Sequence, residues 1–131
     1  MRIYLDATPV IYTVEEMVPF ASLVDARLAA AGVVRVASDL TRLECRVKPI
    51  RDGNTAVLKD YDEYFADNVS EIVPLSRAVM DRATEIRAQY RFKTPDAIHL
   101  AAASVAKCDV FLTNDHRLDR FTGIVIEIVQ P

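Results

Sequence analysis

Short apolar runs alternate with longer segments in which apolar residues recur every three or four positions. The short runs are bounded by polar or turn-forming residues, and this is typical of buried β-strands. They span residues 3–5, 33–37, 71–74, 110–112 and 124–129. The pattern therefore predicts about five strands.

The longer segments predict helices. They span residues 8–14, 20–31, 38–49, 54–65, 76–90 and 94–105. Thr8 and Thr94 are preferred N-cap residues, and each precedes a proline that fits the first helical position. Ser38 and Ser76 mark the start of two further helices. The last helix is apolar on nearly every side, so we expect it to be buried.

Strands that alternate with helices indicate parallel βαβ units. The predicted fold class is therefore α/β, a three-layer α/β/α sandwich with a parallel sheet of about five strands flanked by helices. The chain has 131 residues, of which 51% are hydrophobic, so it is long enough to bury one core. No linker or repeat interrupts it, and we expect a single domain over residues 1–131.

The composition of the chain limits the expected cellular compartment and the classes of binding partner. The apolar run after Met1 is too short for a signal peptide, and no run reaches the ~20 residues of a membrane span. We therefore expect a cytoplasmic protein with no membrane partner. Cys45 and Cys108 lack metal-type spacing and are interpreted as free thiols. Because the net charge is −3, any nucleic-acid contact must come from local clusters of Lys and Arg.

Four acidic residues occupy positions where a ligand site would form in such a fold. Asp6 and Asp115 follow predicted strands, and Asp96 lies in the first turn of the buried helix. Glu44 lies on the side of its helix that carries Leu40. In parallel sheets, ligands bind outside the carboxyl ends of the strands, near a topological switch point. Each acid also has an ordinary explanation in a cap, a turn or the helix dipole.

Together, the four acids favour a metal site. Two carboxylates about 4 Å apart repel by about 4 kcal/mol at an effective dielectric of about 20, so stability alone would not select their clustering. A hard divalent cation such as Mg2+ or Mn2+ resolves the repulsion, because it binds carboxylate oxygens and water. Such an ion polarises a phosphoryl oxygen and supplies hydroxide for attack on a phosphodiester.

Four motifs follow one another along the chain. They are Ile3-Tyr4-Leu5-Asp6-Ala7-Thr8, Thr41-Arg42-Leu43-Glu44, Thr94-Pro95-Asp96-Ala97-Ile98-His99-Leu100-Ala101 and Leu112-Thr113-Asn114-Asp115. In order and spacing they resemble the PIN domain, the ribonuclease fold of VapC-type toxins of toxin–antitoxin pairs. The resemblance implies a PIN-like fold and an Mg2+/Mn2+-dependent endoribonuclease that acts as a toxin. It also implies that Asp6, Glu44, Asp96 and Asp115 bind the ion and are catalytic.

The same resemblance implies roles for neighbouring residues. Thr8 and Thr113 match hydroxyl positions that orient metal-bound water or a carboxylate, and Asp119 adds a further, outer acid. Ala7 and Pro9 depart from the usual pattern, although neither removes a carboxylate. These departures concern the fine geometry of the site.

The partners implied by the resemblance are an RNA substrate, a cognate VapB-type antitoxin and a second copy of the chain in a homodimer. The antitoxin would lie across the toxin and block its site. We expect its groove on the apolar helices between Val10 and Ala31, where Met17, Val18 and Phe20 lie, although core packing explains most of these residues equally well.

Two basic groups adjoin the acid-bearing segments. Arg42 and Arg46 flank Glu44, and Arg91 and Lys93 precede the buried helix. They are either solvated helix faces or phosphate contacts that guide RNA to the cation. The sequence favours neither interpretation over the other.

The two histidines have separate interpretations. His99 lies three residues after Asp96 and therefore on the same side of the helix. We expect it to be partly buried and bonded to a neighbour or in a dimer contact, and a general base is the alternative. His116 is expected to be exposed, and no histidine spacing supports a zinc site.

An alternative function is a non-catalytic PIN-like module that binds RNA or regulates through an acidic pocket. Its receiver-like version would need a lysine near the end of the strand at 110–112, and no lysine follows that strand. The presence of all four acids favours the nuclease.

Overall fold

The computed structural model describes all residues from 1 to 131. In chain order the elements are β1 (Arg2–Leu5), α1 (Ala7–Val14), α2 (Phe20–Leu28), β2 (Val34–Ser38), α3 (Asp39–Arg51), α4 (Thr55–Asp67), β3 (Glu71–Val73), α5 (Arg77–Tyr90), α6 (Thr94–Val105), β4 (Val110–Thr113), the short 3-10 helix η1 (His116–Arg120) and β5 (Val125–Ile128). All five predicted strands and all six predicted helices are present.

The strands form one parallel sheet in the order β3-β2-β1-β4-β5. In the centre, Tyr4 of β1 pairs with Val36 of β2 and with Phe111 of β4. The chain fills one half of the sheet with β2 and β3 and returns to the other half with β4. The strand order therefore reverses between β1 and β4, which is the switch point where α/β folds bind ligands.

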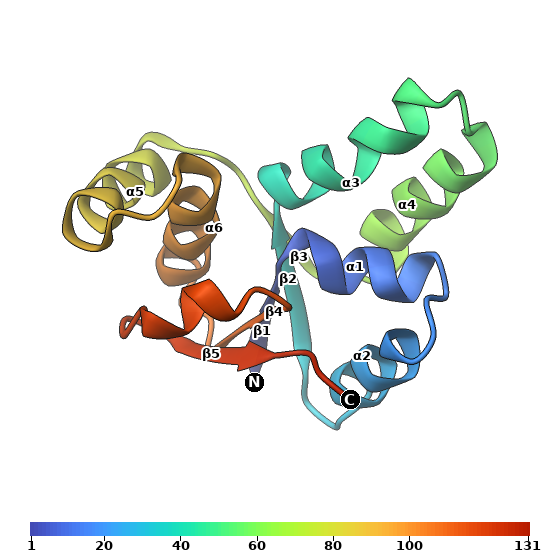
Figure 1. The fold of residues 1–131 in the computed structure, drawn as a ribbon, viewed down its shortest axis with the longest axis horizontal. Helices are drawn as coiled ribbons and strands as arrows, with labels where there is room; N and C mark the ends of the chain where they lie inside the picture. The colour runs from blue at the N-terminus through green and yellow to red at the C-terminus, as the bar shows by residue number, and fades with distance from the viewer.

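Helices cover both faces of the sheet, which confirms the three-layer α/β/α prediction. Figure 1 shows α5 and α6 on one side of the sheet and α1 and α2 on the other, with α3 and α4 above α1. Because both faces are covered, the strands are apolar almost continuously rather than in alternation.

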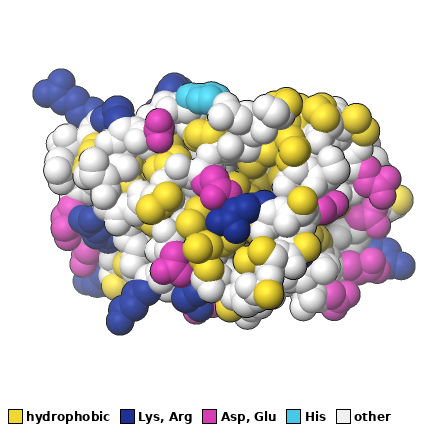
Figure 2. All heavy atoms as spheres, turned by 90° about the horizontal axis from the view of Figure 1, so that it is seen from below, with side chains coloured by type: hydrophobic (Ala, Val, Ile, Leu, Met, Phe, Trp, Pro, Cys, Tyr) yellow, Lys and Arg dark blue, Asp and Glu magenta, His cyan; other side chains and the backbone are white.

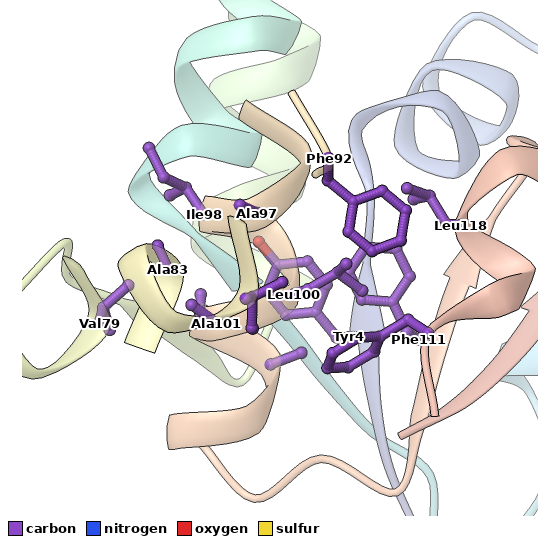
Figure 3. Close-up of a cluster of buried hydrophobic side chains, with 14 of the residues drawn as sticks. Tyr4, Val79, Ala83, Phe92, Ala97, Ile98, Leu100, Ala101, Phe111 and Leu118 are labelled. Atoms are coloured by element: carbon purple, nitrogen blue, oxygen red, sulfur yellow. The ribbon is translucent and has the colours of Figure 1, made fainter. Parts of the chain in front are cut away.

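Each face of the sheet has its own core. On β1, Tyr4 points into the cluster beneath α5 and α6, where Phe111 stacks on its ring at 5.0 Å between centroids. Ile3 and Leu5 point into the cluster beneath α1, α2 and α4. Figure 3 shows the first cluster, with Tyr4 and Phe111 packed against Leu100 of α6. Burial of one such large side chain contributes about 1.5–3 kcal/mol.

The helix α6 is buried, as its composition predicts. Residues 100–103 are 0% exposed, and three of them are alanines. Small side chains let α6 lie close to the sheet and to α5. The first turn of α6, which carries Asp96, is thereby held at the carboxyl edge of the sheet.

Two predicted N-caps are corrected by the structure. The cap of α1 is Asp6 and not Thr8, because the Asp6 carboxylate accepts a hydrogen bond from the backbone N–H of Ala7. The cap position of α6 is Lys93 and not Thr94. The Thr94 hydroxyl accepts a hydrogen bond from Arg87 Nε at 3.0 Å, so it does not cap the helix.

Other element boundaries differ from the predictions by a few residues. Helix α2 ends at Leu28 rather than Ala31, and α3 continues past Pro49 to Arg51. The short helix η1 was not predicted, since five residues are too few for a periodic pattern. None of the helices combines the length and apolar composition that a membrane crossing requires.

Candidate active site

Asp6 and Thr113 meet at the switch point of the sheet. The backbone N–H of Asp6 continues the pairing of β1 with β4 by donating to the Leu112 carbonyl at 3.1 Å. One carboxylate oxygen of Asp6 accepts from the Ala7 N–H at 2.8 Å, and the other accepts from the Thr113 hydroxyl at 2.7 Å. Both oxygens of this carboxylate are therefore oriented by β4 and α1.

Glu44 and His99 join α3 to α6 beside Asp6. His99 is 2% exposed, and its Nε2 lies 2.5 Å from Glu44 Oε1 and 3.5 Å from Asp6 Oδ1. One ligand atom from each of the three residues lies within 4.8 Å of the other two. The sequence patterns did not identify His99 as a member of this cluster.

Two opposing effects act on the pKa of His99. Burial lowers the pKa, whereas the hydrogen bond to Glu44 and the negative charges of Asp6 and Glu44 raise it. The net direction is upward, because the acids surround the imidazole. The expectation of a buried histidine bonded to a neighbour is confirmed by these contacts.

Asp96 and Asp115 do not belong to the group of ligand atoms within 4.8 Å of one another, but their charges act at the same edge of the sheet. Asp96 is half-buried in the first turn of α6, and its pKa is raised first by burial and then by the charges of Asp115 and Asp6. The carboxylates that follow β1 and β4 therefore act on the carboxylate in the first turn of α6. The site gathers residues that are far apart in sequence.

Arg117 holds Asp115 in a paired geometry. Its Nε and Nη2 donate to the two Asp115 oxygens at 3.0 and 2.6 Å, and its backbone N–H donates to one of them at 2.9 Å. These bonds lower the pKa of Asp115. Sequence reasoning missed Arg117, and the available signal was its position two residues after Asp115, within reach of an Asx-type turn.

The remaining predicted neighbours of the site lie further from the acids. Thr8 is half-buried in the first turn of α1 and makes no side-chain hydrogen bond. Asp119 is exposed on η1, and His116 is exposed as predicted. The structure therefore brings Thr113 into contact with Asp6 but brings neither Thr8 nor Asp119 into a hydrogen bond with the four acids.

The two basic groups differ in their contacts. Arg42 and Arg46 of α3 both pair with Asp62 of α4, at 3.6 and 2.8 Å. Arg91 and Lys93 are exposed between α5 and α6 and form no ion pair. Only the second group has cations free of a protein partner.

The sequence pattern of the PIN domain family matches residues 3–124. The chain belongs to the PIN domain family. The matched range spans the positions of all four acids. No curated protein sequence is similar enough to this PIN domain to count as a match.

Solved structures of low sequence identity share the fold of this PIN domain. VapBC2 from Rickettsia felis, bound to a promoter DNA fragment, is 14% identical with a TM-score of 0.81 over 99% of this chain and 100% of that one. DNA-bound VapBC from Salmonella typhimurium is 16% identical with a TM-score of 0.72 over 99% of both chains. VapC20 of Mycobacterium tuberculosis, a sarcin–ricin loop cleaving toxin, is 12% identical with a TM-score of 0.69 over 83% and 86%.

PIN nucleases use divalent metal ions, and the residues at this edge fit such an ion. Asp6, Glu44, Asp96 and Asp115 offer carboxylate oxygens, which are the ligands that hard divalent cations prefer. After burial, the charges of Asp115 and Asp6 raise the pKa of Asp96, and a cation would offset the repulsion among these acids. The donor set therefore suits a divalent cation.

Proposed function

We propose that this PIN domain is an endoribonuclease that depends on Mg2+ or Mn2+, with Asp6, Glu44, Asp96 and Asp115 as its catalytic ligands. One observation carries the proposal. Ligand atoms of Asp6 and Glu44 lie within 4.8 Å of one another at the switch point of the sheet. At the same edge, burial and then the charges of Asp115 and Asp6 raise the pKa of Asp96. Repulsion among these acids lowers the stability of the fold, so their clustering is explained by function rather than by stability. Binding of a cation for phosphodiester hydrolysis is such a function.

The residues of the chain prepare the site before substrate binds. Thr113 and the Ala7 N–H orient Asp6, and His99 contacts Glu44. When bound, the ion would supply a polarised phosphoryl oxygen and a hydroxide nucleophile at neutral pH. The chain's own contribution is to keep acceptor oxygens in place, so that little reorganisation is needed during the reaction.

We propose that Arg91 and Lys93 contact RNA phosphates. Both are exposed, and Lys93 directly precedes the helix that carries Asp96. Arg42 and Arg46 belong to the same proposed surface, although each must share its charge with Asp62. Because the chain is acidic overall, these local cations would supply the attraction for RNA.

We also propose that the protein is the toxin of a toxin–antitoxin pair and binds a VapB-type antitoxin, with a homodimer as its assembly. The fold likeness to VapBC complexes supports this proposal. Between α1 and α2, Met17 and Val18 are 43% and 89% exposed. Figure 2 shows hydrophobic side chains gathered at its upper right, on the side where Figure 1 places α1 and α2, and a partner would cover such a surface.

The test is cleavage of structured RNA by the purified protein with Mg2+, with Mn2+ and with EDTA. Asp96→Asn should reduce cleavage about a hundredfold or more, as loss of a charged catalytic group does. Asp60→Asn is the matched control, because Asp60 is exposed on α4 and forms no ion pair. Undiminished cleavage by a folded Asp96→Asn variant would overturn the assignment. RNA binding without cleavage by the parent would favour the regulatory module.

A further inference from the structure

A chain of buried hydrogen bonds lies behind Glu44. The Tyr4 side chain is 0% exposed, and its hydroxyl lies 2.7 Å from both Ser38 Oγ and His99 Nδ1. Figure 3 shows the Tyr4 hydroxyl oxygen, in red, pointing toward the part of α6 that carries Ala97. The chain of bonds therefore connects the N-cap of α3, the central strand β1 and the imidazole on α6.

The contacts of Ser38 fix where its hydrogen points. Ser38 Oγ accepts from the backbone N–H groups of Leu40 and Thr41 at 3.2 and 3.3 Å, since it caps α3. Thr41 Oγ1 donates its own hydrogen to the Leu5 carbonyl at 3.1 Å. The Ser38 hydroxyl is therefore left to donate, and its nearest acceptor is the Tyr4 oxygen at 2.7 Å.

The direction of the remaining hydrogens follows from this one. Because Tyr4 accepts from Ser38, its own hydrogen is left for His99 Nδ1 at 2.7 Å, which is a nearer acceptor than Thr41 Oγ1 at 3.3 Å. An imidazole that accepts at Nδ1 carries its hydrogen on Nε2. That Nε2 lies 2.5 Å from Glu44 Oε1, which as a carboxylate can only accept.

We propose that His99 is a positioning residue, which donates its Nε2 hydrogen to Glu44 and so holds this carboxylate in the ion-binding site. It is neither a metal ligand nor the base of the reaction. This proposal rests on the ion-binding part of the proposed function, and only the effect on cleavage also requires ribonuclease activity. Residues that orient metal ligands in this way affect metal affinity by about 10–100-fold.

The competing arrangement has His99 Nε2 as a ligand beside Asp6 and Glu44, since all three offer atoms within 4.8 Å. It requires the hydrogen on Nδ1, which would have to donate to Tyr4. Tyr4 would then have to donate to Ser38, whose oxygen already accepts two backbone N–H groups, or to Thr41 Oγ1 at 3.3 Å. The Thr41 oxygen is the more distant acceptor and already accepts from the Ser38 N–H at 3.2 Å. The capping of α3 therefore opposes this tautomer.

Two substitutions of His99 distinguish its hydrogen bond to Glu44 from its contribution to packing. The Gln side-chain amide nitrogen reaches the same region as imidazole Nε2 and can donate to Glu44, whereas Leu fills the space without a donor. In Mn2+ titrations followed by electron paramagnetic resonance, His99→Leu should bind about 10–100-fold more weakly than the parent. His99→Gln should recover most of that loss, and kcat for RNA cleavage should follow the same order.

A merely structural role would lower the melting temperature of both variants in EDTA and would leave Mn2+ affinity of the folded protein unchanged. Binding of Mn2+ by folded His99→Leu as tightly as by the parent would therefore overturn the proposal. If the parent binds Mn2+ but cleaves no RNA, the proposed function fails while the positioning result is still measured.

A spectroscopic test addresses the tautomer directly. In 15N-labelled protein, at a pH high enough that the His99 signals no longer change as the pH is raised further, long-range 1H–15N spectra should show His99 with a bare Nδ1 and a protonated Nε2. Addition of Mg2+ should leave this pattern unchanged. His116→Gln assigns the second imidazole. A protonated Nδ1, or loss of the Nε2 hydrogen on addition of Mg2+, would overturn the proposal.

Discussion

At the scale of one residue, the charged form of Asp96 destabilises the folded protein. Its pKa is raised by burial and by Asp115 and Asp6, so its charged form is disfavoured in the folded state. In EDTA near neutral pH, Asp96→Asn should therefore be more stable than the parent. Relief of repulsion on the order of 1 kcal/mol would raise the melting temperature by roughly 3 °C for a chain of this length. Calorimetry measures the difference.

The pH dependence of this difference has a definite sign. An acid with a raised folded pKa stabilises the fold below its unfolded pKa and loses that contribution as pH rises through the folded pKa. The gain in stability of Asp96→Asn over the parent should therefore become smaller as the pH falls toward the ordinary Asp pKa of about 3.9. The control variant Asp60→Asn should have the same melting temperature as the parent. Equal or lower melting of Asp96→Asn at neutral pH would contradict the crowding of charge.

Arg117 competes with a cation for Asp115. Its guanidinium engages both oxygens of that carboxylate and lies in the field of Asp96. Arg117→Ala should bind Mn2+ about threefold more tightly, a modest gain because exposed ion pairs are weak. Titration followed by electron paramagnetic resonance measures the change.

The matched control for Arg117 is Arg82→Ala, which removes an equal charge from a pair with Glu85 on α5. This variant should bind Mn2+ as the parent does. Weaker binding by Arg117→Ala would instead show that the guanidinium supports the site.

The side chains of the site could be predicted only where the backbone pattern fixes them. Asp6 and Asp115 follow strands, so parallel topology alone places them at one edge of the sheet. The contacts of His99 with Tyr4 and Glu44 depend on how α3 and α6 pack across β1, and sequence spacing does not report this. The same holds for Arg117, whose contact follows from the turn after β4.

At the scale of elements, the N-terminus of α3 serves both stability and the site. Ser38→Ala should lose about 1 kcal/mol from the missing cap, and a further loss should follow because Tyr4 loses a buried partner. If the capping bonds set the direction of the Tyr4 hydrogen, Mn2+ affinity should also fall several-fold. Urea unfolding and Mn2+ titration measure the two effects.

The control for Ser38 is Ser76→Ala, because Ser76 caps α5 in the same way but has no contact with the site. It should lose stability without any change in Mn2+ affinity. Equal Mn2+ affinity of the two variants would show that the cap and the site are independent.

Element positions were predicted well because periodicity is a property of consecutive residues. The sequence predicted a strand over residues 71–74, one residue longer than β3, and it predicted Ser76 correctly as the N-cap of α5. The N-caps at Thr8 and Thr94 were wrong, because side chains compete for the same donors. Asp6 already accepts from the Ala7 N–H, and Arg87 donates to the Thr94 hydroxyl.

At the scale of the molecule, alternation of strands and helices predicts a parallel sheet but not the order of its strands. The order β3-β2-β1-β4-β5 depends on where the chain reverses, and this follows from the packing of both faces. β1 is central because its residues are buried on both faces, with Ile3, Tyr4 and Leu5 all 0% exposed. That placement brings Asp6 beside the end of β4.

At the scale of the whole molecule, expression in growing bacteria tests the proposed toxin function. Induced expression of the parent should halt bacterial growth, because cleavage of essential RNA stops protein synthesis. Asp96→Asn should permit growth at an equal protein level, whereas Asp60→Asn should arrest growth as the parent does. Optical density and immunoblotting measure these outcomes. Co-expression of the small gene next to the toxin gene should restore growth, because the proposed antitoxin would cover the site.

The growth result and the cleavage result are independent. Unhindered growth on expression of the parent would contradict the toxin proposal. It would not contradict the proposal that the purified protein cleaves RNA. Arrest by the parent and by Asp96→Asn alike would point to a cause other than hydrolysis at the four acids. Because substitution of Asp96 should change both the repulsion among the acids and the proposed catalysis, a single variant tests the stability, the chemistry and the cellular effect together.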